Sequence, residues 1–439
     1  MAASYFEHQS GARAVFDLFI RRIPHNRSYL VAAGLEDIVS FIRDFHFDNE
    51  SIAYLRDRRI FSESFLQFLS RIKFTGNLWF IPEGTIFFPG EPIVRVEAPI
   101  IEAQLLESFL LNTINLQTTI STKASRVVWA AKEKAIYDFS LRRAQGTDAA
   151  IKVARSSYIA GVKGTSNVLA AKKYNMAAVG TMAHSFVMSF GDELSAFRAF
   201  TQTFPDSSVL LVDTYDTIKG IKNAIAVAKE LQAKGHRLVS VRLDSGDILK
   251  LSRQARRLLD QAGLNYVKIF ASGNLDEYKI QRLVNSKAQV DNFGVGTNMG
   301  TSNDAPFSDV IYKISEVTDR SGRYLPTMKL SHDKVTFPGR KQVYRCFDSR
   351  GMYIKDILGL EDERIKGQPL LMKVMDNGRL IYNLPPLGEI RERCKENLLR
   401  LPEKYKKLTN ASRFPVILSP GLSSLTAKLS QKLKKDLLG

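Results

Sequence analysis

A single histidine, His184, stands in the run GTMAHS, between an apolar run and an amphipathic one, with no cysteine or second histidine beside it. An imidazole that is held on one nitrogen by a carboxylate can present its other nitrogen as a nucleophile, for example toward a phosphoryl group. Asp213, in VDTYDT after the next apolar run, is the candidate carboxylate. A metal site would need more ligands nearby. The alternative is a structural role, in which His184 is a hydrogen-bonded residue near a helix start.

Two later runs offer small residues where a phosphate could bind. FASGN contains Gly273, and FGVGTNMG contains Gly296 and Thr297. Backbone N–H groups at a helix start can approach a phosphate at such positions. The second run is not GxGxxG, because its third glycine comes one residue late, so a dinucleotide fold gets little support. A tight turn that needs glycine would explain either run alone, but the two together favour phosphate.

The run RLDSGD adds a charged pair, Arg242 and Asp244, followed by the turn residues Ser245 and Gly246. Arginine can bind phosphate oxygens with two donors, and a carboxylate can accept hydrogen bonds from ribose hydroxyls. The same aspartate could instead cap the following helix. Spacing alone does not decide between these two roles.

The run DFSLRR pairs the aromatic Phe139 with Arg142, a combination that suits a flat anionic ring. Alternation along a strand puts Asp138 and Ser140 on one side and Phe139 on the other, which leaves a core role for Phe139 open. The sequence contains no HExxH, Cys-His pair or GxSxG, so zinc hydrolysis and acyl transfer lack their groups.

The elements that must position these residues lie between about residues 135 and 301. Apolar β-type runs alternate there with amphipathic helices, as in SVLLVDTYDT before IKNAIAVAKELQAKGH. This order predicts parallel strands joined by right-handed crossovers. Polar residues recur after nearly every strand, which favours an irregular (β/α) barrel of TIM-like type over an open doubly wound sheet.

The flanking regions have other patterns. Residues 14–23 (AVFDLFIRRI) and 34–45 space apolar residues as helices do, residues 78–99 predict a small antiparallel sheet, and residues 100–134 predict a long helix. Strand patterns return in 308–317, 324–337 and 341–348. We therefore expect an α/β fold whose barrel, residues 116–310, carries a peripheral α/β domain built from both chain ends, residues 1–115 and 311–439.

Composition limits the class of protein. The chain has 439 residues, 44% hydrophobic and 25% charged, as in an ordinary globular protein of two or three domains. It has only two cysteines, no apolar run long enough for a bilayer and no signal-like start, so we expect a cytoplasmic protein.

The net charge of +18 invites a nucleic-acid interpretation. From Glu389 onward there are 12 Lys/Arg against 5 Asp/Glu, a balance of +7, and residues 426–439 (TAKLSQKLKKDLLG) predict a basic amphipathic helix. Such a helix is a solvated face or a contact for an anionic partner. A basic chain can equally be one that handles small polyphosphates.

Six runs in this order resemble the nicotinate phosphoribosyltransferase family: DFSLRRAQGTDAA, VKGTSNVLAAKKYNM, VGTMAHSFV, LLVDTYDT, VRLDSGDI and FGVGTNM. The resemblance extends to the early HQSGARAVFDLFIRR and the late MKLSHDKVTFPGRKQVYR. It implies transfer of a phosphoribosyl group from phosphoribosyl pyrophosphate to nicotinate, giving nicotinate mononucleotide and pyrophosphate, with ATP hydrolysis and Mg²⁺. It also implies a type II phosphoribosyltransferase fold and a homodimer with active sites at its interface. The metal ligands are not identified by it.

The resemblance assigns roles residue by residue. It makes His184 the residue that ATP phosphorylates and Asp213 the carboxylate that orients it. It assigns the nicotinate ring to Phe139 and the nicotinate carboxylate to Arg142. The positions that match the phosphoribosyl and phosphate site are Arg242, Asp244, Ser245, Gly246, Gly273, Gly296 and Thr297.

Ser166 distinguishes the acid from the amide. Related enzymes that use nicotinamide carry an aspartate at this place in the KGT-x run, and an aspartate would repel the carboxylate of nicotinate. A serine can donate a hydrogen bond instead, so Ser166 favours nicotinate. The alternatives are nicotinamide or quinolinate as substrate, or a basic protein that binds nucleic acid through its tail; we expect no membrane partner.

One departure from the family concerns the start of the chain. The family usually has a Thr-Asp-Leu-Tyr segment just before the place where this chain begins with MAASYFEHQSG. Its tyrosine closes the nicotinate pocket of the partner subunit. We therefore expect weak nicotinate affinity and slow turnover for a chain without that segment, whether the start is misplaced or the loss is real.

Overall fold

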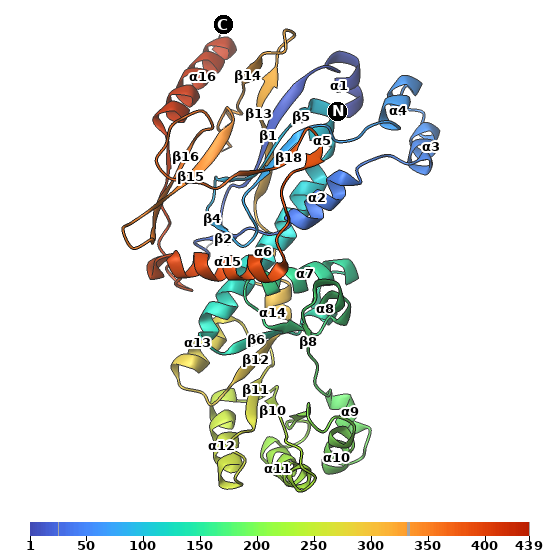
Figure 1. Ribbon diagram of the computed structural model, residues 1–439, viewed down its shortest axis with the longest axis vertical. Coiled ribbons are helices and arrows are strands. Elements are labelled where there is room, and N and C mark those ends of the chain that lie inside the picture. The colour runs from blue at the N-terminus through green and yellow to red at the C-terminus, as the bar shows by residue number, and fades with distance from the viewer. Residues whose placement is uncertain (25, 332–333, 439) are drawn as a thin grey trace. The chain divides into compact units, whose positions relative to one another are not determined.

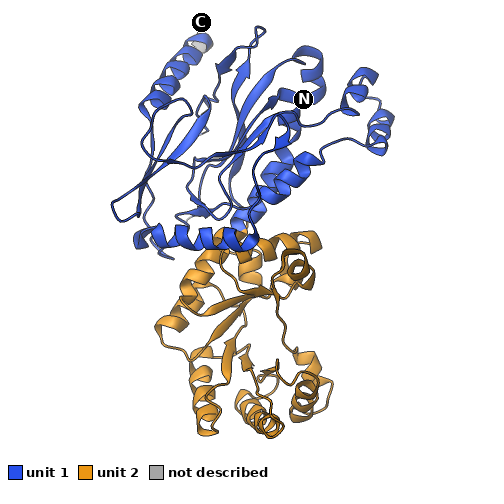
Figure 2. Cartoon of the chain, in the orientation of Figure 1, with its two compact units in different colours: residues 1–119, 307–439 blue, residues 120–306 orange. Residues whose placement is uncertain are grey.

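The computed structural model describes residues 1–24, 26–331 and 334–438, which form two compact units (Figure 2). Unit 1 contains Met1–Thr119 and Phe307–Gly439, and unit 2 contains Ile120–Pro306. The boundaries expected from the sequence were 115/116 and 310/311. Parts of two expected segments, His332 and Asp333 in the late strand run and Gly439 in the tail, lie outside the described residues.

Unit 2 is built on a sheet of seven parallel strands in the order β8-β7-β6-β12-β11-β10-β9, seen in the lower half of Figure 1. The sheet is curled into a TIM-like half-barrel, so the predicted irregular barrel is confirmed. The strands are β6 (Ala135–Asp138), β7 (Gly164–Thr165), β8 (Ala177–Ala178), β9 (Val209–Leu211), β10 (Ser240–Leu243), β11 (Lys268–Ala271) and β12 (Asn292–Val295).

Short polar turns connect β7, β9, β10 and β11 to the helices α8, α11, α12 and α13 of unit 2. Asn167, Asp216, Asp247 and Asp276 are N-cap residues, and each accepts a hydrogen bond from a backbone N–H of the first helical turn. The helices are η1 (Leu141–Arg143), α7 (Thr147–Ile159), α8 (Val168–Tyr174), α9 (His184–Met188), α10 (Glu193–Thr203), α11 (Thr217–Ala233), α12 (Ile248–Gln261), α13 (Glu277–Asn285) and α14 (Thr297–Gly300). The turns that cap these helices therefore also bring the polar residues to one end of the strands.

Unit 1 has an antiparallel sheet in the order β14-β13-β1-β5-β3-β18-β19, which takes strands from both ends of the chain. This confirms the expected peripheral α/β domain. The strands are β1 (Arg13–Ile20), β3 (Asn77–Phe80), β5 (Pro92–Pro99), β13 (Val310–Thr318), β14 (Tyr324–Pro326), β18 (Met372–Asp376) and β19 (Arg379–Leu380).

The helix predicted for residues 14–23 was wrong, because Arg13–Ile20 is the strand β1. It pairs with β5 on one side and β13 on the other, so its near-continuous apolar run is buried on both faces. A short buried run has the same composition in a strand and in a helix, and pairing with distant segments decides the outcome.

The remaining elements of unit 1 complete the peripheral domain. The smaller sheets are β17-β15-β16-β20 and β2-β4. Their strands are β2 (Leu30–Val31), β4 (Ile86–Phe87), β15 (Lys341–Phe347), β16 (Tyr353–Leu360), β17 (Gln368–Pro369) and β20 (Val416–Leu418). The helices are α1 (Ala2–His8), α2 (Leu35–Arg43), α3 (Asn49–Asp57), α4 (Glu63–Leu69), α5 (Ile100–Leu105), α15 (Leu387–Arg400), η2 (Glu403–Tyr405) and α16 (Pro420–Leu438), while α6 (Glu107–Ala131) begins in unit 1 and ends in unit 2.

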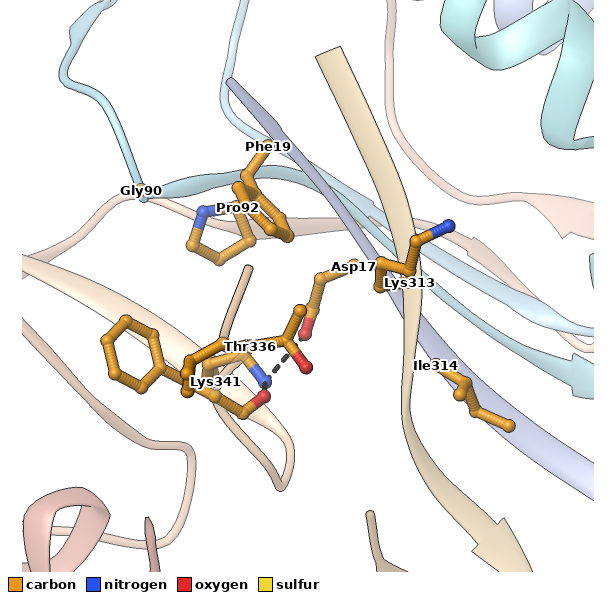
Figure 3. Close-up of a pocket in the computed structure, with 10 residues that line it drawn as sticks. Asp17, Phe19, Gly90, Pro92, Lys313, Ile314, Thr336 and Lys341 are labelled. Atoms are coloured by element: carbon orange, nitrogen blue, oxygen red, sulfur yellow. Dashed lines mark hydrogen bonds and ion pairs between the residues drawn. The ribbon is translucent and has the colours of Figure 1, made fainter. Parts of the chain in front are cut away.

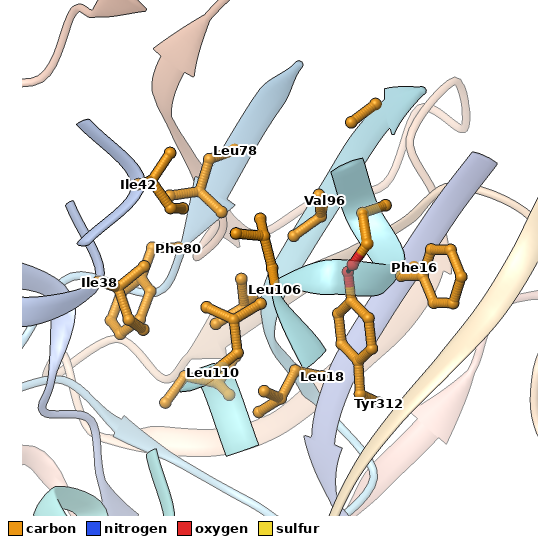
Figure 4. Close-up of a cluster of buried hydrophobic side chains, with 14 of the residues drawn as sticks. Phe16, Leu18, Ile38, Ile42, Leu78, Phe80, Val96, Leu106, Leu110 and Tyr312 are labelled. Atoms are coloured by element: carbon orange, nitrogen blue, oxygen red, sulfur yellow. Dashed lines mark hydrogen bonds between the residues drawn. The ribbon is translucent and has the colours of Figure 1, made fainter. Parts of the chain in front are cut away.

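The core of unit 1 lies between its large sheet and the helices α2, α5 and α6 (Figure 4). Phe16 on β1 stacks on Tyr312 of β13, with ring centroids 4.7 Å apart. The Tyr312 hydroxyl donates a hydrogen bond to the carbonyl oxygen of Ala103 on α5. The polar atom of this buried ring is thereby satisfied, and the helix is tied to the sheet.

A buried ion pair joins two strands of unit 1 (Figure 3). The Lys341 ammonium lies 2.7 Å from a carboxylate oxygen of Asp17 and donates to the carbonyl oxygens of Phe337 and Gly339. Burial lowers the pKa of Lys341, although Asp17 opposes this shift. The adjoining cavity of about 40 Å³ is too small for a substrate.

The basic amphipathic helix predicted at the C-terminus is confirmed as α16. Leu422 is buried, whereas Lys428, Lys432, Lys434 and Lys435 are exposed. In the part of the chain that the structure describes, no helix combines the length and the apolar character that crossing a membrane requires.

Candidate active site

A cavity of about 460 Å³ opens at the carboxyl ends of the unit 2 strands. This is the end of a barrel at which functional sites are built. It is lined by residues of β9, β10 and α9 and of the segments that follow β6, β7, β8 and β10: Phe139, Leu141, Arg142, Ser166, Gly180, Thr181, Met182, Ala183, His184, Ser185, Leu211, Arg242 and Asp244. Six of the residues expected in the site, Phe139, Arg142, Ser166, His184, Arg242 and Asp244, therefore share one cavity.

His184 is the first residue of α9, and its half-exposed ring lies between a hydroxyl and two carboxylates. Its Nδ1 lies 3.1 Å from Oγ1 of Thr214. Its Nε2 lies 3.8 Å from Asp244 Oδ2 and 4.0 Å from Asp213 Oδ1. Two negative charges on the Nε2 side favour a proton on Nε2, so Nδ1 is left to accept the hydroxyl hydrogen of Thr214.

Asp213 is buried at the end of β9, with only 1% of its side chain exposed. Its Oδ2 accepts hydrogen bonds from the backbone N–H of Asp244 and from the hydroxyl of Ser245. Its Oδ1 has no hydrogen-bond partner among the described residues. The free oxygen faces His184, so this carboxylate retains an acceptor for a proton or a cation in the cavity.

Arg242 and Asp244 form a polar network on the next strand. The guanidinium donates to Asp244 Oδ1 at 2.6 Å, to Ser272 Oγ at 2.8 Å and to Thr181 Oγ1 at 2.7 Å. Burial alone would raise the pKa of Asp244, but the positive charge of Arg242 and hydrogen bonds from Ser272 and Arg242 outweigh it and hold this pKa below its usual value. Asp244 is thus kept ionised beside the cavity. The helix cap considered as its alternative role is made by Asp247 instead.

An aromatic wall closes another side of the cavity. Phe139 stacks on Phe270, with ring centroids 5.5 Å apart and an interplanar angle of 18°. The guanidinium of Arg242 lies 5.4 Å from the Phe139 ring centroid. Gly294 allows this packing, since a Cβ there would lie 2.7 Å from Phe139 and 2.8 Å from Phe270. Phe139 is half-buried and lines the cavity, while its neighbours Asp138 and Ser140 are buried, as the alternation predicted.

The buried Asp138 fixes the loops that carry Phe139 and Ser166. Its carboxylate accepts hydrogen bonds from the backbone N–H and hydroxyl of Ser140 and from the hydroxyl of Thr165. Its carbonyl oxygen accepts from the backbone N–H of Ser166. Burial raises the pKa of Asp138 despite these hydrogen bonds. Its function is therefore to position neighbouring residues, because its oxygens face into the protein.

The expected phosphate loops lie beside this cavity and do not line it. Gly246 and Gly273 border a neighbouring cavity of about 440 Å³, together with Lys279 and Arg282. Gly273 has a φ of +92°, and a Cβ there would lie 1.8 Å from the carbonyl oxygen of Asp244, so only glycine fits. Ser245 is exposed and directly follows Asp244, which lines the first cavity.

Gly296 and Thr297 begin α14, after β12. Gly296 approaches the chain at Phe139, whose carbonyl oxygen would lie 3.1 Å from a Cβ at this position. Neither residue lines the two cavities described above. Their place at a helix start remains suited to binding a phosphate through backbone N–H groups.

Three hydroxyl residues of the site were missed in the sequence. Thr214, Thr181 and Ser272 contact His184, Arg242 and the Arg242–Asp244 pair respectively. Each stands within three residues of a position that was singled out, in VDTYDT, GTMAHS and FASGN. The sequence feature that could have identified them is their position in polar turns that follow strands. Their hydrogen-bond partners could not be predicted, because the pairing of each hydroxyl depends on how three separate loops pack.

The chain matches three family models along its length. Residues 1–115 match the nicotinate phosphoribosyltransferase (NAPRTase) N-terminal domain, residues 134–322 match the NAPRTase family, and residues 365–426 match the nicotinate phosphoribosyltransferase C-terminal domain. These matches cover both units of the structure.

Known proteins resemble the chain over nearly all of its length. A nicotinate phosphoribosyltransferase of Mycobacterium tuberculosis is 46% identical over 433 residues, which cover 98% of this chain and 91% of the relative. A Bacillus subtilis nicotinate phosphoribosyltransferase is 38% identical, covering 93% of this chain and 88% of the relative.

Two solved structures have the same fold. The crystal structure of human nicotinic acid phosphoribosyltransferase superposes with a TM-score of 0.87 at 28% identity and covers 98% of each chain. A nicotinate-nucleotide pyrophosphorylase from Pyrococcus furiosus superposes with a TM-score of 0.71 at 28% identity, covering 91% of this chain and 92% of the other.

Proposed function

The chain belongs to the nicotinate phosphoribosyltransferase family, and from this premise we propose that it joins nicotinate to phosphoribosyl pyrophosphate. The products are nicotinate mononucleotide and pyrophosphate, a step of NAD salvage. The observation that carries the proposal is that one cavity contains both a ring-binding set, Phe139, Arg142 and Ser166, and a charged set around His184.

Nicotinate would bind against the aromatic wall. The half-buried Phe139 ring, which lines the cavity, suits contact with the pyridine ring, and the Arg142 guanidinium suits the carboxylate as a bidentate donor. Ser166 can donate a hydrogen bond to the same carboxylate. The absence of a negative charge at position 166 supports nicotinate over nicotinamide. A dicarboxylate such as quinolinate would need more cations than Arg142 supplies.

The phosphoribosyl group would lie along the Arg242–Asp244 pair. Asp244 is ionised and can accept hydrogen bonds from ribose hydroxyls, while Arg242 already has three partners that fix its orientation. Ser245 and Gly246 extend this edge. Gly273, in the turn after β11, and Gly296 and Thr297, at the start of α14, would bind the 5′-phosphate through their backbone N–H groups. In this arrangement C1 of the ribose is presented to the nicotinate nitrogen between the two sets of residues.

His184 would couple the reaction to ATP. Once the Thr214 hydroxyl releases the lone pair of Nδ1, this nitrogen attacks the γ-phosphorus, a new N–P bond forms, and the bond from phosphorus to the β,γ-bridging oxygen breaks as ADP leaves. Water later cleaves the N–P bond and releases phosphate. Asp213 and Asp244, on the side of Nε2, stabilise the positive charge that the ring acquires.

Mg²⁺ fits this site through its oxygen donors. Among the described residues there is no group of three or more His, Cys, Asp or Glu side chains that could enclose a metal ion. Mg²⁺ usually needs only one or two carboxylates, because substrate phosphates and water supply its other ligands. Asp213, with its unpartnered Oδ1, and Asp244 would hold it. Bound there, Mg²⁺ would neutralise phosphate charge.

Two further properties remain part of this proposal. The family resemblance predicts a homodimer with its active sites at the subunit interface. The composition predicts a cytoplasmic location, and the family motifs argue against nucleic acid as the partner.

A single assay tests the proposed function. Purified protein is incubated with nicotinate, phosphoribosyl pyrophosphate and Mg²⁺, with and without ATP, and nicotinate mononucleotide is measured by chromatography. We expect product in both cases and more of it with ATP. Nicotinamide and quinolinate, tested in parallel, should give far less. Product from quinolinate or nicotinamide alone would contradict the proposal.

A further inference from the structure

The segment that carries His184 lies between β8 and β9, and these two strands do not pair with each other. β8 and β9 are consecutive along the chain, yet they lie at opposite ends of the seven-stranded order. No ladder joins them among the described residues, and the segment between them forms α9 and α10. The position of His184 is therefore set by how these two helices pack on their neighbours.

Contacts between aromatic side chains join α9 to α10. Phe186, two residues after His184, lies with its ring centroid 4.9 Å from that of Phe190. It also meets Phe200 of α10 edge-on at 5.7 Å. A displacement of α10 would consequently displace His184 as well.

A partly buried hydrogen bond fixes α10 to α11. Glu193 opens α10 and is only 6% exposed; its Oε2 accepts a hydrogen bond of 2.9 Å from the side-chain amide of Asn223 on α11. Its Oε1 has no hydrogen-bond partner among the residues described. Burial raises the pKa of Glu193, and the bond from Asn223 opposes the shift. Because the Glu193 carboxylate is nearly buried, leaving it without this hydrogen-bond donor would be costly.

This contact lies at the base of the loop that carries Asp213 and Thr214. Gly220 of α11 makes the approach possible, because a Cβ there would lie 2.1 Å from the carbonyl oxygen of Val212 and 3.1 Å from Glu193 Oε2. Val212 directly precedes Asp213. The Glu193 carboxylate therefore connects the histidine segment to the strand end that carries its partners.

A second contact joins the same two helices farther along. Arg198 of α10 and Glu230 of α11 form an ion pair of 2.7 Å, with 51% and 42% of their side chains exposed. An exposed pair of this kind contributes little. It supplies a matched control, since it links α10 to α11 without being buried at the base of the active-site loop.

We propose that Glu193 and Asn223 are positioning residues for phosphoryl transfer to His184. They hold α10, and through it α9, at the distance at which His184 meets Thr214, Asp213 and Asp244. This inference rests on the proposed ATP coupling and adds two residues that touch neither the nicotinate nor the phosphoribosyl set.

The test compares Glu193→Ala and Asn223→Ala with Arg198→Ala. Three quantities are measured: the rate of phosphohistidine formation from γ-labelled ATP, ATP-independent formation of nicotinate mononucleotide, and the melting temperature. We expect the first two variants to slow phosphorylation about tenfold and to change ATP-independent transfer by less than about threefold. Arg198→Ala should resemble the wild type in both rates.

The Glu193→Gln variant removes the negative charge of Glu193 and keeps an acceptor for the hydrogen bond from Asn223. Its amide oxygen can still accept the hydrogen bond from Asn223, so phosphorylation should remain within about threefold of the wild-type rate. If Glu193→Ala fails to fold, Asn223→Ala against Arg198→Ala decides the question.

Two results would overturn the inference: phosphorylation in Asn223→Ala as fast as in Arg198→Ala, or an equal loss of both activities in the Asn223 variant. A wild-type protein that never forms phosphohistidine would refute the proposed coupling itself, and this inference would fall with it.

Discussion

The Nδ1 atom of His184 lies 3.1 Å from Oγ1 of Thr214, the residue that follows the carboxylate in VDTYDT. The resemblance assigned the orienting role to Asp213, whose Oδ1 lies 4.0 Å from the opposite ring nitrogen. The ring thus has a hydroxyl on one edge and carboxylates on the other. Because the carboxylates favour a proton on Nε2, we expect Nδ1 to be the nitrogen that attacks ATP.

Thr214→Val should slow the phosphorylation of His184 about fivefold. The change removes the hydroxyl that aligns Nδ1 at almost constant volume, and one hydrogen bond of this kind contributes about 1 kcal/mol. The measurement is the rate at which labelled phosphate from ATP becomes bound to protein. Thr214→Ser should recover most of the rate.

The nitrogen that is modified provides an independent check on the same geometry. In wild-type protein labelled with ¹⁵N-histidine, NMR of the phosphorylated form should show the phosphoryl group on Nδ1. Thr203→Val is the control for the Thr214 change, since the Thr203 hydroxyl donates to the carbonyl oxygen of Ala199 in its own helix. A phosphoryl group on Nε2 would contradict the assignment.

His184→Ala should abolish the advantage that ATP gives while some ATP-independent transfer survives. The histidine serves coupling, whereas the bond between ribose and nicotinate forms among other residues. The measurement is kcat/KM for nicotinate with and without ATP. Complete loss of transfer in the absence of ATP would show that His184 takes part in bond formation itself.

Ser166→Asp should raise the KM for nicotinate at least about tenfold. Two carboxylates that face each other in a partly buried cavity repel by several kcal/mol at a separation of about 4 Å. Nicotinamide, which is neutral, should lose less, so the ratio of the two kcat/KM values is the quantity to measure.

Ser185→Asp adds the same charge to another wall of the same cavity and serves as the control. If both variants raise the nicotinate KM equally, the effect belongs to net charge and not to position 166.

The sequence predicted the parallel sheet and six residues that prove to share one cavity, because both depend on local patterns. Alternating apolar runs and helices predicted the half-barrel, and polar turns after strands predicted the residues that line the cavity. The strand β1 was mistaken for a helix, since its burial depends on pairing with β5 and β13, which are distant in the chain. No local pattern encodes such partners.

Side-chain partners within the site were harder to predict than its members. Thr181 and Ser272 bind Arg242 from two other loops, and these contacts exist only after three strands have aligned. The buried Glu193 likewise reads as an ordinary acidic residue at a helix start. Its contact with Asn223 comes from the packing of two helices.

Gly294→Ala should weaken nicotinate binding by disturbing the aromatic wall. The new methyl group would lie 2.7 Å from Phe139 and 2.8 Å from Phe270, so the rings must separate. Overpacking of this kind costs about 1–3 kcal/mol of stability. We expect a lower melting temperature and a higher KM for nicotinate. Gly388→Ala, where a Cβ meets nothing within 4 Å, is the control and should change neither.

A buried acidic pair in unit 1 makes stability depend on pH. Glu91 and Asp356 are fully buried together with Arg345, which binds Asp356 through two hydrogen bonds. Burial, and then the charge of Asp356, raises the pKa of Glu91 well above its usual value. Such a group contributes stability below its unfolded-state pKa, about 4.3, and loses that contribution as the pH rises through its folded-state pKa.

Glu91→Gln should therefore be progressively more stable than the wild type as the pH rises. Glutamine imitates the neutral acid: its oxygen can accept the bond that Glu91 now accepts from the backbone N–H of Phe88, and its amide can donate to Asp356. The difference in unfolding free energy should grow by about 1.4 kcal/mol per pH unit above 4.3, until the folded-state pKa is passed. Urea unfolding at pH 5 and pH 8 measures it. Glu50→Gln, on the exposed face of α3, should show no such trend. A Glu91→Gln variant whose advantage stays constant between these two pH values would mean that Glu91 is already ionised in the folded protein.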